Sequence, residues 1–354
     1  MAINNNKYLI RFFQVGKGKD GGDAILIRLF SDKDEERLFL IDGGYQETGE
    51  AIISYIKNEC STRTISIMFN THPDKDHISG LTTILKSEDI KVDNIVLNRP
   101  WKDAKFTKEM FKDERITDKS LINRLKVAFN FAEDLEELAT KKGISIKRCF
   151  RDDNEKLGIL NIIGPSKDLY KRGLLASKKT PESYIEDGLK DYKPTAFPEE
   201  DYKTGETIEW YDDEETSAVN QTSLIIALHL GKTKVLFTGD AGKTAMREAM
   251  SYYKSIGGNP KEFTIVQLPH HGSRKNIDPG IIDEFDNPNF IISCPPDGEK
   301  EGHPSRRLIN KLLELNPDAS IYVTKTQNFI FRKNVEAKCS IQHPAQSTPK
   351  MDGK

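Results

Sequence analysis

The residues with the clearest capacity for chemistry lie in one short segment, His72-Pro-Asp-Lys-Asp-His77. Two imidazoles and two carboxylates within six residues, directly after the apolar run at 64–69, form a dense set of metal ligands. Alternate side chains diverge where a strand ends in a loop, so His72 and Asp74 can serve one ion while Asp76 and His77 serve a second. The segment has no cysteine and therefore suits Zn²⁺ or Mn²⁺. The plainer alternative is that Asp74 or Asp76 only caps the following helix.

Three further segments place polar side chains where strands are expected to end. Leu40-Ile-Asp-Gly-Gly44 supplies Asp42, Leu236-Phe-Thr-Gly-Asp240 ends on Asp240, and Leu268-Pro-His-His-Gly-Ser273 supplies a pair of histidines. Strand ends are the usual place for a site in layered α/β folds. Each segment alone indicates only a turn, but together with residues 72–77 they supply enough ligands for a dinuclear centre.

The elements that must position these residues alternate between strands and helices. Short apolar runs bounded by glycine and aspartate predict strands, and amphipathic periodicity predicts helices. Strands are expected at 8–13, 24–30, 37–41, 64–69, 90–97, 144–147, 157–163, 223–230, 234–237, 263–268, 290–293, 320–324 and 328–332, and helices at 50–58, 78–87, 244–255 and 305–315. This order predicts an α/β layered sandwich.

Two stretches interrupt the pattern. Residues 100–143 are charged and helical in periodicity, and residues 167–215 are polar and predicted to contribute few core positions. Because both ends of the second stretch flank the proposed site, a lid or partner-docking arm is weighed against a solvated surface excursion. We therefore expect one domain over residues 1–345 with these two insertions, followed by a disordered tail at 346–354.

Composition narrows the class of protein. The 354 residues include 53 Lys+Arg and 55 Asp+Glu, a net charge of −2, which argues against a surface coated in nucleic acid but leaves a local basic groove open. No apolar run approaches the roughly 18 to 20 residues that a membrane helix needs, and the start lacks a leader pattern. A cytoplasmic protein without a membrane partner is expected. The four isolated cysteines indicate buried thiols rather than a disulfide framework.

Taken together, the motifs resemble those of the metallo-β-lactamase-fold hydrolases, and most closely the soluble nuclease-like domain of the ComEC-type competence proteins of DNA uptake. The resemblance is carried by Phe13-Gln-Val-Gly16 with Asp23-Ala-Ile-Leu-Ile27, Leu40-Ile-Asp-Gly-Gly44, Thr71-His-Pro-Asp-Lys-Asp-His77 with Gly80, Asn220-Gln-Thr-Ser-Leu224, Phe237-Thr-Gly-Asp240, Pro269-His-His-Gly-Ser273 and Gly302-His-Pro304. It implies a four-layer αβ/βα metallo-β-lactamase sandwich, here with two insertions, that binds two divalent metals.

The resemblance also implies a ligand set in which Asp240 bridges the ions. Sequence leaves open which of His270 and His271 is a ligand; His271 is favoured, with His270 facing substrate. The implied metal ligands are His72, Asp74, Asp76, His77, Asp240 and His271.

The chain departs from its relatives at three places. Asp74 stands where β-lactamases carry a second histidine, and Asn220 where many relatives have a third, so harder ligands favour Mn²⁺ over a tight Zn²⁺, with Mg²⁺ as an alternative. Residues 17–22 enlarge the loop after Gly16 and add two lysines, and this loop is expected to border the site.

The leading hypothesis is a metal-dependent hydrolase that cleaves phosphodiester bonds, a nuclease acting on DNA. The alternatives are a phosphodiesterase for a small cyclic or modified nucleotide and an inactive binding or scaffold protein, with a protein partner in a multi-protein system also expected. The residues expected to act in catalysis are His270, Asp76 and His303, the last with a turn-shaping role as its alternative. The expected substrate contacts are Lys17, Lys19, Asn220, Ser273, Arg274 and Lys275.

Overall fold

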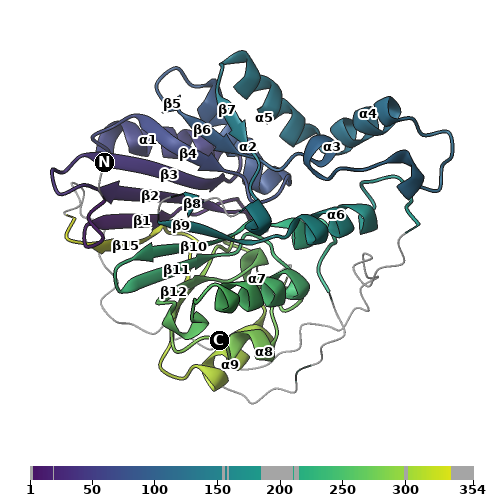
Figure 1. Ribbon diagram of the computed structural model, residues 1–354. Helices are drawn as coiled ribbons and strands as arrows, with labels where there is room; N and C mark the ends of the chain where they lie inside the picture. The colour runs from purple at the N-terminus through teal and green to yellow at the C-terminus, as the bar shows by residue number, and fades with distance from the viewer. Residues whose placement is uncertain are drawn as a thin grey trace.

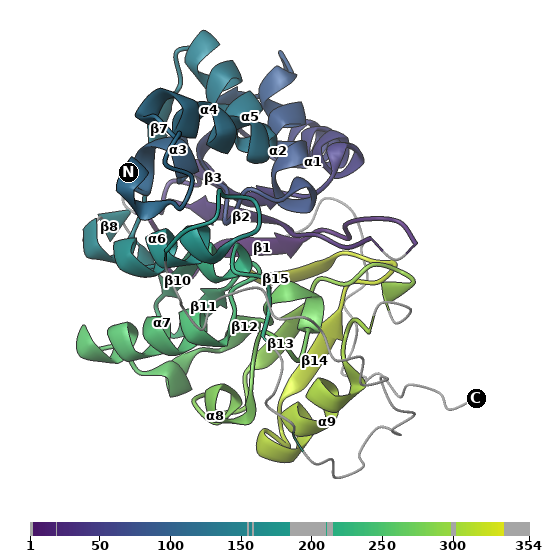
Figure 2. The ribbon, with the colours of Figure 1, turned by 90° about the vertical axis from the view of Figure 1, so that its right-hand side faces the viewer.

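The computed structural model describes residues 3–18, 20–153, 156–157, 159–184, 210, 215–298 and 302–335. These residues form two β-sheets packed face to face, with helices on both outer faces (Figure 1). The view in Figure 2 separates the four layers as helix, sheet, sheet and helix. The predicted αβ/βα sandwich is therefore confirmed.

The first sheet collects the strands of the N-terminal half. Its main path among the described residues runs β15 (Phe329–Lys333), β1 (Tyr8–Phe12), β2 (Ala24–Phe30), β3 (Glu36–Gly43), β4 (Thr64–Phe69), β6 (Asn94–Val96) and β7 (Ser145–Lys147), with β5 (Lys91–Val92) beside β4. The strand expected at 90–97 is thus two short strands. The edge strand β15 comes from the other end of the chain and pairs antiparallel with β1, from Tyr8 opposite Lys333 to Phe12 opposite Phe329.

The second sheet collects the strands of the C-terminal half. Its described order is β14 (Ser320–Val323), β13 (Asn289–Ile292), β12 (Ile265–Gln267), β11 (Thr233–Phe237), β10 (Ile225–Leu230), β9 (Leu160–Gly164) and β8 (Lys156–Leu157). Strands β11 to β14 are parallel, and β10 is antiparallel to β11. Parallel strands bring their carboxyl ends to one edge, which is where the motif after β11 and the motif after β12 meet.

The core between the sheets is apolar on both sides. Phe12 of β1 faces Phe237 of β11 with ring centroids 6.2 Å apart, and Phe39, Phe69 and Leu228 are buried in the same cluster. Because nearly every side chain of β1, β2 and β3 is buried, these strands show continuous apolar runs rather than an alternating pattern.

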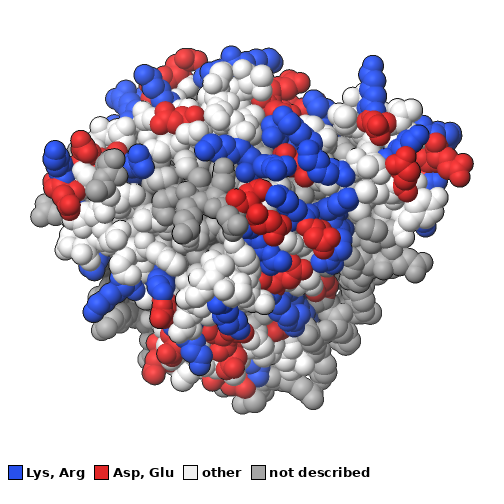
Figure 3. All heavy atoms as spheres, in the orientation of Figure 1, with Lys and Arg blue, Asp and Glu red and all other residues white. Residues whose placement is uncertain are grey.

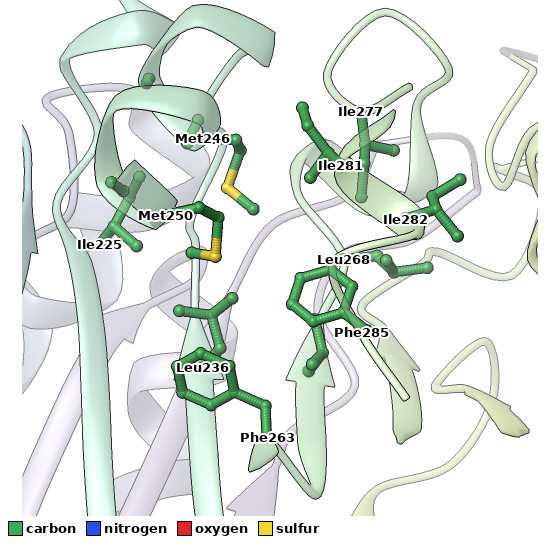
Figure 4. Packing of buried hydrophobic residues seen from close by; sticks show 14 of the residues in the cluster. Ile225, Leu236, Met246, Met250, Phe263, Leu268, Ile277, Ile281, Ile282 and Phe285 are labelled. Carbon is green, nitrogen blue, oxygen red and sulfur yellow. The ribbon is translucent and has the colours of Figure 1, made fainter. Parts of the chain in front are cut away.

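Helices cover the outer faces. Helices α1 (Gln46–Glu59), α2 (Lys75–Lys86) and α5 (Asn130–Lys141) pack on the first sheet, and α7 (Lys243–Ser255), α8 (Pro279–Ile282) and α9 (Arg306–Leu315) cover the second. Figure 4 shows Met246 and Met250 of α7 packed against Leu236 of β11, opposite Ile281 and Phe285. The flexible methionines fill the gap between helix and sheet.

The two insertions share a small core of their own. Helices α3 (Pro100–Asp103), α4 (Asp118–Ala128) and α6 (Lys167–Ala176) bury Phe111, Leu125, Phe129 and Tyr170 together. The expectation that residues 167–215 contribute few core positions is wrong for α6, whose apolar face completes this cluster. Most of residues 185–214 and the predicted tail at 346–354 lie outside the described residues, so the lid and the tail stay predictions.

Candidate metal centre

The segment between β4 and α2 places its four polar residues on two kinds of backbone. His72 follows β4 on a loop and is buried, whereas Asp76 and His77 lie in the first turn of α2. The helix was expected to begin at residue 78 but begins at Lys75, because Asp74 takes the N-cap position. Within the described chain the Asp74 carboxylate makes no capping hydrogen bond, so capping does not account for it.

Asp240, at the end of the loop after β11, lies between two groups of side chains. Its Oδ2 is 3.6 Å from Nε2 of His72 and 3.7 Å from Nε2 of His270, whereas its Oδ1 is 3.4 Å from Nε2 of His77. Two ligand atoms that share an ion at about 2.1 Å are separated by about 3.4 Å when the geometry is tetrahedral. The two carboxylate oxygens therefore face different sets of imidazoles at separations suited to two ions.

Each group has a second carboxylate. Asp74 Oδ2 lies 3.7 Å from Nε2 of His72, and Asp76 Oδ2 lies 3.5 Å from Nε2 of His77 and 3.7 Å from Nε2 of His271. We call His72, Asp74 and His270 the first cluster, and Asp76, His77 and His271 the second cluster, with Asp240 between them.

The histidine pair has an unusual backbone. His270 and His271 have φ of 49° and 57°, followed by Gly272 at 78°. Left-handed conformations cost energy for residues with a Cβ and persist where the surroundings enforce them, often at functional sites. Here the conformation directs the two imidazoles to different clusters, His270 toward Asp240 and His271 toward Asp76, each at 3.7 Å.

Asp42, at the end of β3, fixes the orientation of His77. The carboxylate is fully buried and accepts hydrogen bonds from His77 Nδ1 at 2.8 Å, from the Thr71 backbone N–H at 2.8 Å and from Thr71 Oγ1 at 2.6 Å. Because Nδ1 donates to Asp42, the neutral imidazole would direct its Nε2 lone pair toward Asp76 and Asp240.

Asn276 does the same for the first cluster. Its Oδ1 lies 3.0 Å from His270 Nδ1, and its Nδ2 donates to the backbone carbonyl of Asp240 at 2.9 Å. The side chain is fully buried and ties the two ligand-bearing loops together.

Gly80 lets α2 approach β3 closely enough for these contacts. Its backbone N–H donates to the carbonyl of Gly44 at 2.8 Å, and a Cβ at this position would lie 1.9 Å from the carbonyl oxygen of Gly43. Only glycine fits there, which explains why the motif that follows His77 includes it.

The site balances buried carboxylates with imidazolium charge. Burial alone would lower the pKa of His77, but Asp240 and Asp76 raise it well above its ordinary value. Burial would also lower the pKa of His271, but the hydrogen bond with Asp76 raises it to about 9. Burial would raise the pKa of Asp240, yet His270 and His77 hold it well below its usual range. Protons thus occupy imidazole nitrogens that divalent cations would take over.

The residues fit a pair of metal ions. Among the described residues, Nε2 of His72, Nε2 of His77 and Oδ1 of Asp240 are buried polar atoms without a hydrogen-bond partner. Leaving such atoms unpaired is costly, and all three point between the clusters at ligand spacing. Nitrogen and carboxylate donors without thiolate are the chemistry that Zn²⁺ and Mn²⁺ accept.

The predicted substrate contacts have mixed outcomes. Asn220 is buried, and its carboxamide accepts from Ser217 Oγ at 2.7 Å and donates to Thr216 Oγ1 at 3.0 Å, so it shapes a loop rather than offering an amide to substrate. Ser273 is also buried and its Oγ accepts from the Lys275 backbone N–H. The Asn220 contact is corrected, because both atoms of its carboxamide are engaged within its own turn, whereas the Ser273 hydroxyl only accepts there and its contact with substrate stays a prediction.

The basic candidates lie around the centre. Lys17 is exposed and pairs with Glu47 at 3.5 Å, Lys19 lies outside the described residues, and Arg274 and Lys275 are half-buried beside the histidine pair. The enlarged loop borders the site as expected, since a Cβ on Gly21 would lie 3.1 Å from the ring of His271.

His303 joins the histidine group from the segment before α9. Its ring centroid is 5.3 Å from that of His270, and burial together with His270 lowers its pKa to about 3. The imidazole is therefore neutral near pH 7. It can donate a hydrogen bond from one nitrogen, but the expected role of proton donor to the leaving oxygen is not supported by this charge state.

Three residues that contact the candidate ligands escaped the sequence argument. Asp42 was singled out only as a strand end, Asn276 was not noticed, and Lys179 lies in the stretch taken as polar insertion. Lys179 Nζ donates to Asp74 Oδ1 at 2.5 Å. No local spacing could reveal it, because the two residues are 105 positions apart.

Comparison with protein families identifies the class of protein to which the chain belongs. The family model of the metallo-β-lactamase superfamily matches residues 18–278, and the chain belongs to that superfamily. Membership indicates a metal-dependent hydrolase. No protein of curated function matches the sequence.

Several solved structures match the chain at low sequence identity. One is the hydrolase AbOPH of the β-lactamase superfamily, with 11% identity and a TM-score of 0.30 over 62% of this chain and 56% of that one. Another is a putative metallo-β-lactamase from Thermotoga maritima, with 9% identity and a TM-score of 0.30 over 66% of this chain and 79% of that one. A long form of RNase Z from yeast has 16% identity and a TM-score of 0.35 over 80% of this chain and 36% of its own. The chain thus spans about half the length of the first and about a third of the last.

Proposed function

We propose that this chain cleaves phosphodiester bonds at a dinuclear metal centre, with DNA as its substrate. The observation that carries the proposal is the position of Asp240, whose two carboxylate oxygens face separate clusters of imidazoles and carboxylates. The motifs also resemble those of the nuclease-like domain of ComEC-type proteins, which supports DNA as the substrate.

The first cluster would hold one ion through His72, Asp74 and His270, and the second cluster would hold the other through Asp76, His77 and His271, with Asp240 shared. This assignment moves His270 from facing substrate to binding metal, because its Nε2 lies as close to Asp240 as that of His72 does. A set of four imidazoles and three carboxylates accepts Mn²⁺ or Zn²⁺, with Mn²⁺ favoured because Asp74 replaces a histidine, and Mg²⁺ is the alternative.

Two divalent ions bound here would polarise a phosphoryl oxygen and lower the pKa of a bound water toward neutrality. The protein's own residues hold the geometry for that chemistry. Asp42 keeps Nε2 of His77 directed inward, and Asn276 keeps His270 beside Asp240. His303, neutral and close to His270, is placed to donate a hydrogen bond to a phosphate oxygen.

A small nucleotide is the second candidate substrate. The face in Figure 3 carries lysine and arginine side chains intermixed with aspartate and glutamate rather than one basic trench. Pairs such as Arg172 with Glu248 at 3.2 Å neutralise part of the positive charge. A polymer backbone is drawn to continuous positive charge, so mixed charge favours a compact anion.

None of the helices in the described part of the chain has the length and apolar character that crossing a bilayer requires.

The test is a substrate panel on metal-stripped protein. Supercoiled and linear DNA, single-stranded DNA, RNA and cyclic dinucleotides are incubated with Mn²⁺, Mg²⁺ or Zn²⁺ added singly. The Asp240→Ala variant, purified identically, controls for contaminating nucleases. Cleavage of DNA by the wild type alone supports the proposal, and cleavage of only the cyclic dinucleotides selects the second candidate. Equal cleavage by wild type and variant, or none with any metal, refutes both.

A further inference from the structure

The segment after α6 brings a positive charge to the first cluster. Lys179 Nζ donates to Asp74 Oδ1 at 2.5 Å, while the other oxygen of the same carboxylate, Oδ2, lies 3.7 Å from Nε2 of His72. One oxygen of Asp74 thus faces the proposed metal and the other faces an ammonium group. Asp74 is the position at which this chain has a carboxylate where β-lactamases carry histidine.

The backbone that carries Lys179 is held in place. The Lys179 N–H donates to Ser177 Oγ at 3.0 Å, and Thr180 Oγ1 lies 2.7 Å from the carbonyl of Leu174 in α6. Further along, Ser183 Oγ donates to the carbonyl of Leu175 at 2.9 Å. These bonds anchor the turn to the end of α6, so the lysine is presented by a fixed element.

The insertions support the turn from the other side. The Tyr184 N–H donates to the carbonyl of Met110 at 3.1 Å, and the Lys112 N–H donates to that of Glu182 at 2.9 Å. Lys179 Nζ also lies 5.6 Å from the ring centroid of Phe129, a contact of the cation–π kind. Both insertions therefore combine to deliver one lysine to the metal centre.

The charge of the candidate metal centre indicates what Lys179 can do there. The carboxylates of Asp74, Asp76 and Asp240 and the buried Asp42 and Asp23 offset the charge of the proposed ions, so an ammonium group beside them adds to the attraction for an incoming anion. The side chain of Lys179 is 43% exposed although it pairs with Asp74, so its ammonium can also contact a bound anion. An exposed ion pair contributes little to stability, about 0 to 1 kcal/mol. A role in folding alone does not account for a lysine on a ligand carboxylate.

We propose that Lys179 belongs to the active centre, where its ammonium, held beside Asp74, binds a non-bridging oxygen of the substrate phosphate. The proposal rests on the proposed function, since it names the residue that recognises the phosphodiester anion. No proton is transferred; the ammonium acts as a fixed positive charge and hydrogen-bond donor.

The test compares Lys179→Met, Lys179→Gln and Lys179→Arg with Lys178→Met, which removes the same charge one residue earlier at an exposed position. Four quantities are measured on Mn²⁺-loaded protein: ions bound per chain, the Kd of inorganic phosphate by calorimetry, and kcat and KM for bis(p-nitrophenyl) phosphate. In Lys179→Met and Lys179→Gln we expect metal content to stay at the wild-type level, phosphate affinity to fall about tenfold or more, and KM to rise by a similar factor. Lys179→Arg should recover most of the affinity, and Lys178→Met should match the wild type.

Unchanged phosphate affinity and KM in Lys179→Met would overturn the proposal, as would loss of a metal ion or failure of the wild type to bind phosphate. The two proposals fail separately. If the wild type cleaves no phosphodiester but Lys179→Met still weakens phosphate binding, the proposed function falls and the role of Lys179 stands. If the wild type cleaves and Lys179→Met is indistinguishable from it, only the role of Lys179 falls.

Discussion

Replacing Asp42 with asparagine tests how the second cluster is held. The wild-type carboxylate accepts from His77 Nδ1 at 2.8 Å, from Thr71 Oγ1 at 2.6 Å and from the Thr71 N–H at 2.8 Å. An asparagine keeps one acceptor oxygen, for the Thr71 N–H, and turns an NH₂ group toward His77. The imidazole can pair with that group only if Nδ1 becomes the acceptor, which moves the ring proton to Nε2, the nitrogen that faces the metal.

Restoring the ligating tautomer in Asp42→Asn therefore gives up a charge-assisted hydrogen bond, a cost of about 1.5–3 kcal/mol. That cost corresponds to a loss of about 10- to 100-fold in affinity at the second cluster, the range seen when outer-shell partners of metal ligands are removed. Calorimetric titration of metal-stripped protein with Mn²⁺ should show one weakened site and one nearly unchanged site. Asp103→Asn, which alters a buried carboxylate of α3, is the matched control and should keep both affinities. If Asp42→Asn binds Mn²⁺ at both sites with the wild-type affinities, the reasoning is refuted.

Three further outcomes follow from the same geometry. Gly80→Ala, whose Cβ would lie 1.9 Å from the carbonyl oxygen of Gly43, should push α2 outward, lower stability by about 1–3 kcal/mol in thermal denaturation and weaken the second ion; a wild-type melting temperature would contradict this. His270→Ala and His271→Ala should each retain about one ion per chain by elemental analysis, whereas two ions in His270→Ala with turnover down about 10²- to 10⁴-fold would return His270 to a substrate-facing role. Because the pKa of His271 is raised to about 9 in the metal-free protein and a ligand must be deprotonated, Mn²⁺ affinity should rise from pH 6.5 to 9 with proton release; a flat profile would exclude this linkage.

The sequence predicts the architecture because its strands stand out as continuous apolar segments. Runs such as Ala24–Phe30 are buried on both faces and read as continuous apolar segments, and the boundaries of β4 match the prediction residue for residue. Helix starts are less predictable. A strand-to-helix transition at Asp74 moves Asp76 and His77 from a loop onto α2, because an N-cap role depends on backbone angles that composition does not specify.

The candidate site also has one part that the sequence predicts and one part that it does not. Residues within one motif, such as His72 and His77, are visible from spacing alone, and the structure brings the predicted ligands together. Pairings that depend on tertiary packing are not: Asn220 was assigned to substrate but engages Thr216, while Lys179 reaches Asp74 from the far side of an insertion. Side-chain direction at such positions follows from neighbours distant in sequence.

The pairing of β15 with β1 determines when the first sheet is completed during translation. The ribosome releases β1 long before β15, so the strand that covers its outer edge arrives only when Lys333 has been synthesised. Until then an apolar sheet presents an unpaired edge, the kind of surface that associates with other chains and that chaperones shield. Asp240 and the histidine pair are also translated long after the His72 segment, so a nascent chain has half a metal centre. The candidate ligand set is therefore complete before the edge of the first sheet is covered, and both follow translation of the second sheet's first strands.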